Sequence, residues 1–193
     1  GDQTNLGKGL ALLHQNSASA GNKNFGWENE GFIGSEIQKG GWGSRWGKFF
    51  VEFRLVPQIK KGRHWGLSLS HYKDLLEKLI IFLDKHDPKP SLVHGDLWSG
   101  NSGVDESSKG IIFDPASWWA DREVDIAMTR LFGGFSRSFY EGYNEIWPLS
   151  NCSKERIDIY NLYHLLNHAN IFGGHYKKQS LDGLNKIDLK LKF

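Results

Sequence analysis

The residues with the clearest chemical potential lie between Leu92 and Asn101. Asp96 follows an apolar run and a glycine, a pattern that favours a tight turn with an exposed carboxylate. Asn101 comes five residues later, so a single loop can direct both side chains toward one point. Asp96 and Asn101 therefore form the first part of a candidate site.

A second carboxylate, that of Asp114, reaches the same place if the intervening chain forms a hairpin. Val104 and the run Ile111 to Phe113 predict two short strands around a polar loop at 105–110. Because a hairpin returns the chain to its starting point, we expect Asp114 to lie near Asn101. Two carboxylates and an amide then supply the oxygen ligands that suit Mg²⁺, with room for water and phosphate.

This combination is typical of phosphotransferases, in which one Asp orients or deprotonates the attacking hydroxyl while an Asn and a second Asp hold the metal. The spacing of His94, Asp96 and Asn101 matches the catalytic loop of protein kinases. Gly95 replaces the Arg of that template, and Asp114-Pro115-Ala116 replaces its Asp-Phe-Gly, which favours a kinase of small molecules. ATP and Mg²⁺ are the expected cofactors.

Around this loop the sequence resembles the fructosamine kinase (ketosamine-3-kinase) family, on the aminoglycoside- and choline-kinase side of the protein-kinase-like fold. The resemblance begins with His94 to Asn101, including Trp98-Ser99-Gly100, and extends over nearly the whole chain. The other matching motifs are Asp114-Pro115-Ala116-Ser117, Glu123-Val124-Asp125-Ile126-Ala127, Leu131-Phe132-Gly133-Gly134-Phe135, Leu166-Asn167-His168, Phe25-Gly26 and Gly31-Phe32-Ile33.

The resemblance implies ATP-dependent phosphorylation of a sugar hydroxyl on an amine glycated through a fructose- or ribulose-type linkage. The glycated amine would be a free amino acid or a protein lysine. The resemblance also implies that Asp96 is the general base, that Asn101 and Asp114 are metal ligands, and that Trp98 lines the sugar site. It supports His168 as a substrate-binding residue, a role that spacing alone does not predict.

Two further residues are interpreted as structural support for the loop. His94 is expected to be a packed, hydrogen-bonded scaffold, and Asp125 a buried carboxylate that hydrogen-bonds the loop backbone. His164 and His168 have a spacing that can bind zinc, but Leu165 stands where a zinc motif needs Glu, and no third ligand is evident. The sequence therefore predicts no zinc site.

The remaining pattern predicts a mainly α, α+β chain: the C-terminal lobe of a protein-kinase-like fold over residues 1–193, with a small β-hairpin carrying metal ligands. A long aromatic loop is expected at about 17–43. The helices are expected at about 4–16, from 44 to Pro57, 70–85 with Ser70 as the cap, 121–131, 135–146, 153–171 and 178–192.

The first predicted helix is preceded by no strand-rich segment with a phosphate-contacting Lys, so we expect the N-terminal β-lobe of such kinases to be absent. A fragment or pseudokinase of this kind should bind ATP poorly and turn over little. The alternative function is a non-catalytic kinase-fold subunit or scaffold, with a missing lobe or partner chain over the apolar cleft. A third interpretation, an aminoglycoside, choline or homoserine-like substrate, is disfavoured by Trp98-Ser99-Gly100 and by Leu131 to Phe135.

Composition excludes several other classes. The 193 residues include 24 Lys and Arg and 22 Asp and Glu, a net charge of +2, which does not indicate a nucleic-acid or membrane-surface protein. No apolar run approaches the roughly 18 residues of a membrane span. The single cysteine, Cys152, excludes an internal disulfide framework and favours a reducing compartment, either cytoplasm or organelle stroma or matrix.

Overall fold

The computed structural model describes residues 2–107, 109–150 and 152–191. The chain divides into two compact units, one formed by Gly1–Lys23 and Lys89–Ile157, the other by Asn24–Pro88 and Asp158–Phe193. The assignment of residues 1–193 to a single lobe stays a prediction. The mainly helical content with small sheets agrees with the predicted α+β class. Within the described residues, no helix is long and apolar enough to cross a membrane.

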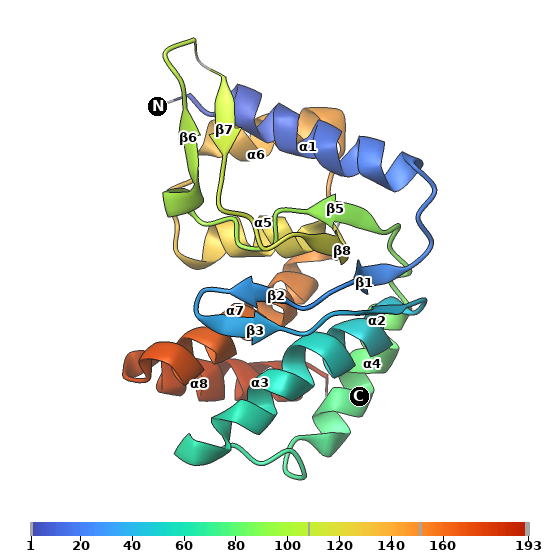
Figure 1. Cartoon of the computed structure of the whole chain (residues 1–193), viewed down its shortest axis with the longest axis vertical. Helices are drawn as coiled ribbons and strands as arrows, with labels where there is room; N and C mark the ends of the chain where they lie inside the picture. The colour runs from blue at the N-terminus through green and yellow to red at the C-terminus, as the bar shows by residue number, and fades with distance from the viewer. Residues whose placement is uncertain (1, 108, 151, 192–193) are drawn as a thin grey trace. The chain divides into compact units, whose positions relative to one another are not determined.

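The first unit combines three helices with two pairs of short strands (Figure 1). Its strand pairs are both antiparallel, β5 with β8 and β6 with β7. Helix α7 (Ser153–Phe172) contributes residues to both units. The other elements of the first unit are α1 (Thr4–Ser19), β5 (Ser91–Val93), a 3₁₀ turn (Ser99–Asn101), β6 (Ser102–Val104), β7 (Gly110–Ile112), β8 (Trp118–Ala120), α5 (Glu123–Leu131) and α6 (Arg137–Ile146).

Apolar side chains from α1, α5 and α6 form the core of this unit. The buried members of that core are Leu6, Leu10, Ala11, Leu97, Ile126, Phe139 and Tyr143. Helices α1 and α6 approach closely because both carry a glycine at the crossing. A Cβ on Gly7 would lie 2.0 Å from the carbonyl oxygen of Phe139, and one on Gly142 would lie 2.3 Å from that of Thr4.

The second unit contains two antiparallel strand pairs, β1 with β4 and β2 with β3, followed by helices. Its core is rich in aromatic residues, with Trp46, Phe50 and Tyr160 in mutual ring contact. The elements are β1 (Phe25–Trp27), β2 (Gly31–Ile33), β3 (Glu36–Gln38), β4 (Gly41–Gly43), α2 (Trp46–Phe50), a π-helix (Val51–Leu55), α3 (Val56–Lys61), a 3₁₀ helix (Gly62–Trp65), α4 (Lys73–Asp84) and α8 (His175–Lys190), besides most of α7.

Three local features differ from the expectations. The segment expected as a loop at about 17–43 contains the end of α1 and four strands, each too short to show an alternating pattern. Ser70 does not cap α4, because the helix begins at Lys73 and Tyr72 is its N-cap residue; the hydroxyl of Ser70 instead lies 2.8 Å from that of Ser68. Pro57 does not end the helical run, because the π-helix just before it opens the backbone where its ring would otherwise clash.

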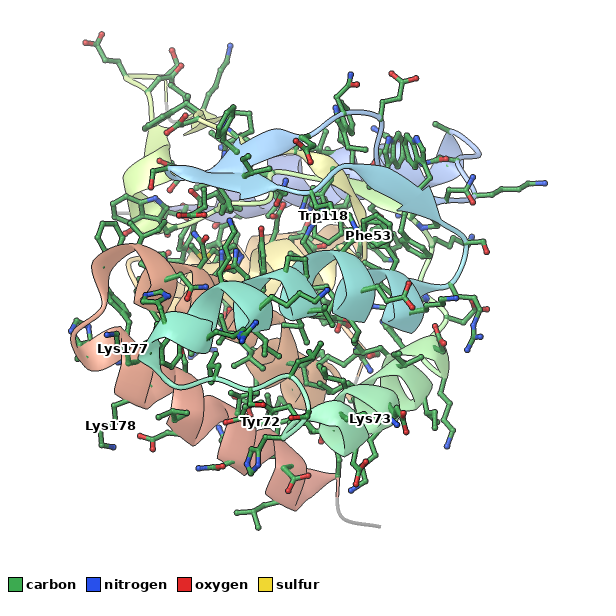
Figure 2. All side chains as sticks on the ribbon, turned by 60° about the horizontal axis from the view of Figure 1, so that its bottom comes forward. Phe53, Tyr72, Lys73, Trp118, Lys177 and Lys178 are labelled. Carbon is green, nitrogen blue, oxygen red and sulfur yellow. The ribbon has the colours of Figure 1, made fainter. Side chains whose placement is uncertain are left out.

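The basic residues near the C-terminus lie along α8. Lys177 and Lys178 project from one end of this helix (Figure 2). Lys178 pairs with Asp182, and both Lys186 and Lys190 pair with Asp158. Much of the positive charge is therefore neutralised within the unit.

Candidate active site

The candidate catalytic loop, residues 94–101, begins where β5 ends. Val93 pairs with Trp118 of β8, a strand that the sequence did not predict. Leu97 is buried in the core of the first unit, whereas its neighbours Asp96 and Trp98 are half-buried and exposed. The apolar side chain of Leu97 therefore anchors the loop, and the polar residues beside it remain accessible.

Glycine is required at position 95 of this loop. Gly95 has a φ of +83°, and a Cβ there would lie 2.2 Å from the carbonyl oxygen of Ala116. The backbone N–H of Ala116 donates a 2.9 Å hydrogen bond to the carbonyl oxygen of His94. The chain after the hairpin thus packs directly against the loop, which leaves no space for the Arg of the protein-kinase template.

Asn101 links the loop to the hairpin. Its buried side chain donates from Nδ2 to the carbonyl oxygen of Asp96 at 3.0 Å, and its own carbonyl oxygen accepts the N–H of Phe113 at 3.1 Å. Since Nδ2 is engaged, Oδ1 is the atom that Asn101 can offer to a ligand. The hairpin therefore returns to Asn101, and Asp114 follows Phe113 directly.

Asp114 lies in the left-handed region, with a φ of +55°, and is exposed. Its carboxylate is close enough to Asp96 to raise the pKa of that group electrostatically. Burial is the larger cause, and Asp114 and Asp125 add to it, while His94 opposes it. Together they raise the pKa of Asp96 to about 6, which suits a group that accepts a proton near neutral pH.

The imidazole of His94 bridges the two ends of the site. Its Nε2 lies 2.8 Å from the carbonyl oxygen of Phe113, and its Nδ1 accepts the N–H of Asp96 at 3.3 Å. A carbonyl can only accept, so Nε2 carries the proton. His94 therefore connects the residue before Asp114 with the backbone of Asp96.

Asp125 of α5 holds the backbone of the loop from its buried side. Its Oδ2 accepts the N–H of His94 at 2.7 Å, its Oδ1 accepts the N–H of Gly95 at 2.9 Å, and His14 Nε2 lies 3.1 Å from Oδ2. Burial by itself raises the pKa of Asp125, but the hydrogen bond from His14, the imidazoles of His14 and His94, and the N–H of Gly95 outweigh it. The net pKa is lowered, and the carboxylate stays ionised.

The indole of Trp98 covers the next turn of the loop and remains 41% exposed. A Cβ on Gly100 would lie 2.2 Å from its Cη2 atom, so the ring packs on the bare backbone of that glycine. Ser99 packs in the same way against Gly134, where a Cβ would lie 2.4 Å from the Ser99 Cβ. Gly100 therefore supports the indole, which stays accessible to a ligand, and Gly134 supports the residue that follows it.

His168 belongs to the other unit. It is half-buried on α7, its Nδ1 donates to the carbonyl oxygen of His164 at 2.8 Å, and its ring contacts those of Phe172 and Tyr176. Burial lowers the pKa of His168, with the hydrogen bond to His164 opposing the change. Its role in substrate binding stays a prediction.

Sequence reasoning missed His14 and Tyr143, which lie behind the loop. His14 follows Leu6 and Leu10 at intervals of four residues, so it occupies the apolar stripe of α1. A polar side chain on such a stripe signals a buried hydrogen-bonding partner, and Nδ1 of His14 lies 2.8 Å from the hydroxyl of Tyr143.

The chain as a whole is similar to one described protein family and to several of its named relatives. The family model described as fructosamine kinase matches residues 1–190. A probable ketoamine kinase of Vibrio parahaemolyticus is 45% identical over 182 residues, covering 94% of this chain and 62% of that protein. The chloroplastic protein-ribulosamine 3-kinase of Arabidopsis thaliana is 37% identical over 184 residues, covering 94% of this chain and 56% of that one.

A solved structure of a similar protein has the same fold. The crystal structure of a candidate fructosamine-3-kinase from Haemophilus somnus has a TM-score of 0.86 at 34% identity, covering 96% of this chain and 63% of that one. The chain belongs to the fructosamine kinase family. It spans less than two thirds of the length of these relatives.

Proposed function

We propose that the protein phosphorylates a sugar hydroxyl of ketosamines, that is fructosamines or ribulosamines, at the expense of ATP. The observation that carries the proposal is the convergence of Asp96, Asn101 and Asp114 at one loop, supported on its buried side by Asp125. Family membership and the names of the relatives, a ketoamine kinase and a protein-ribulosamine 3-kinase, support the substrate class. The glycated amine is a small molecule or a protein lysine.

Asp96 acts as the general base in this proposal. Its carboxylate takes the proton of the sugar hydroxyl as the hydroxyl oxygen forms its bond to phosphorus and the bond to the leaving ADP oxygen breaks. A base of this kind contributes about 10² to 10⁴ in rate. With a pKa of about 6, Asp96 is still mostly ionised at neutral pH. The raised pKa also makes it a better proton acceptor than an ordinary carboxylate.

The site fits Mg²⁺. Asn101 Oδ1 and the exposed carboxylate of Asp114 are hard oxygen donors, and the mutual repulsion of Asp96 and Asp114 is the kind of unfavourable charge that a divalent cation offsets. Asn101 and Asp114 would hold the ion, which when bound neutralises negative charge on the nucleotide phosphates. His94 and Asp125 hold these residues in place through hydrogen bonds to the backbone on either side of them.

Trp98 supplies a platform for the sugar, because an exposed aromatic face suits the apolar face of a sugar ring and this indole is fixed on Gly100. We assign His168 a supporting role in substrate binding on the strength of the family resemblance. A reducing compartment such as cytoplasm or organelle stroma suits a chain with a single cysteine, Cys152.

The experiment offers the protein fructosyl-lysine and ribulosyl-lysine with ATP and Mg²⁺, and follows the sugar phosphate by ³¹P NMR. We expect the wild type to form a sugar phosphate only slowly, in line with the low turnover predicted from the sequence, and Asp96→Asn to form at least about 100-fold less. The half-buried hairpin residue Asp105, whose carboxylate accepts N–H groups of its own loop, is changed to Asn as the matched control and should keep the wild-type rate. Equal rates for the wild type and Asp96→Asn would remove Asp96 from the mechanism. Absence of product from both sugars would favour a scaffold function instead.

A further inference from the structure

A chain of hydrogen bonds runs behind the catalytic loop through three helices of the first unit. The hydroxyl of Tyr143 on α6 lies 2.8 Å from His14 Nδ1 on α1, and His14 Nε2 lies 3.1 Å from Asp125 Oδ2 on α5. Asp125 in turn holds the N–H groups of His94 and Gly95. All three side chains of the chain are buried.

The donor and the acceptor of each hydrogen bond in this series can be assigned. Arg122 Nη1 lies 3.1 Å from the Tyr143 oxygen and can only donate to it. The phenol hydrogen is then free to point at His14 Nδ1, which leaves the ring proton on Nε2, facing Asp125. Burial raises the pKa of Tyr143, so the phenol keeps the hydrogen that this arrangement requires. Every buried polar atom along the chain thereby has a partner.

The far end of the chain is fixed by Arg122. Its guanidinium donates to the carbonyl oxygens of Trp147 and Pro148, both at 2.6 Å, and lies 4.0 Å from the centre of the Trp147 ring. Helix α6 is also held against α1 at Gly142, where the backbone of Thr4 comes so close that no side chain would fit. The Tyr143 hydroxyl, one residue further on, is therefore delivered to His14 by two rigid attachments.

We propose that Tyr143 is a positioning residue for the catalytic loop: its hydroxyl, acting through His14 and Asp125, holds the backbone of His94 and Gly95 so that Asp96 is correctly placed. Its effect on turnover rests on the function proposed above. Tyr143 lies behind the loop and is 1% exposed, so its hydroxyl acts on the loop from the buried side and not from the side open to substrate. Loss of its hydroxyl should slow the chemical step without weakening substrate binding.

The first test compares Tyr143→Phe with Tyr140→Phe. Tyr140 lies on the same helix and also donates one hydrogen bond, to Thr129 Oγ1 at 3.2 Å, but it is not part of this chain. We expect Tyr143→Phe to lower kcat about fivefold, the value of one ordinary hydrogen bond, with KM for the sugar unchanged. Tyr140→Phe should keep the wild-type kcat. An unchanged kcat in Tyr143→Phe, or a rise in KM alone, would overturn the proposal.

A double-mutant cycle tests whether Tyr143 acts through His14. His14→Leu removes both the acceptor for the Tyr143 hydroxyl and the donor to Asp125. In the His14→Leu background, Tyr143→Phe should therefore lower kcat no further. Additive losses would mean that Tyr143 affects the loop by another route, and the proposal would be wrong.

A third measurement needs no turnover and separates this inference from the proposed function. Amide exchange of Gly95 and His94, followed by NMR, should be about fivefold faster in Tyr143→Phe than in Tyr140→Phe. Equal exchange in the two variants would reject the positioning role even if the protein is a kinase. Absence of kinase activity would leave this comparison valid.

Discussion

The side-chain amide of Asn101 donates a 3.0 Å hydrogen bond to the carbonyl oxygen of Asp96. This bond leaves the side-chain oxygen of Asn101 as the atom that the proposed metal site would use, and it also closes the turn that presents Asp96. Asn101→Ala removes both effects. We expect its turnover to fall at least about tenfold and its rate to need more Mg²⁺, as for loss of one metal ligand.

A Mg²⁺ titration of the rate measures this change. Asn144, an exposed residue whose Oδ1 accepts the N–H of Leu149, is the matched control, and Asn144→Ala should leave the Mg²⁺ requirement unchanged. If Asn101→Ala slows turnover with an unaltered Mg²⁺ dependence, Asn101 supports the turn but binds no metal.

The raised pKa of Asp96 predicts the pH dependence of activity. Only the ionised carboxylate can accept a proton, and burial raises the pKa of this group to about 6. The value of kcat/KM should therefore be constant above that pH and fall about tenfold for each pH unit below it. Initial rates between pH 5 and pH 8 provide the check, and a profile that stays flat through pH 6 would contradict the role of Asp96.

The same pKa predicts a conflict between function and stability at Asp96. Between the ordinary pKa of 3.8 and the folded value of about 6, the folded state binds more protons than the unfolded state. Stability therefore decreases as the pH rises through this window, and the whole cost is present above pH 6. Asp96→Asn removes the charge and should stabilise the protein at pH 7.5 by about 1 to 2 kcal/mol, a range reduced for the partial exposure of the side chain.

Urea unfolding at two pH values measures this effect. The gain from Asp96→Asn should become small at pH 3.5, where the wild-type carboxyl is protonated in the folded state and mostly protonated in the unfolded state. A variant that is less stable than the wild type at pH 7.5 would show that Asp96 makes favourable contacts that outweigh its burial.

Sequence reasoning was most informative where chemistry depends on local spacing. The loop that carries both Asp96 and Asn101, and the hairpin that brings the chain back to Asn101, could both be predicted, because turn and strand signals are local. The partners of Asp125 could be described only in general terms. His14 lies 111 residues from Asp125, and no periodic pattern specifies a contact over that separation.

The short strands were the main structural omission, for a related reason. Strands β1 to β4 have three residues each, and β8 contains two adjacent tryptophans, so neither segment shows the alternation that marks a half-buried strand. These strands form because their neighbours pair with them. Local propensity does not contain that information.

Asp125→Asn should destabilise the fold strongly. The native carboxylate accepts from His94, Gly95 and His14, whereas an amide would turn one N–H₂ group toward these donors. We expect a loss of about 3 kcal/mol at neutral pH, as for other buried charged hydrogen-bonding groups.

Because the pKa of Asp125 is lowered in the folded state, its contribution is present above pH 3.8 and is lost as the pH falls below it. Denaturant unfolding at pH 7 and pH 3 should show a large and then a reduced difference, and an equal difference at both would contradict an ionised Asp125.

Gly95→Ala tests whether the loop needs a residue without a side chain. Alanine at a φ of +83° costs about 1 kcal/mol or more, and its Cβ would meet the Ala116 carbonyl at 2.2 Å, so one strand end must move. We expect a total loss of at least about 2 kcal/mol and a lower kcat, since the displaced residue is next to Asp96.

Gly103 is the matched control, because it lies in β6 of the same unit and a Cβ added there would meet no atom within 4 Å. Gly103→Ala should unfold within about 0.5 kcal/mol of the wild type, and a Gly95→Ala protein of equal stability would show that the loop can widen without cost.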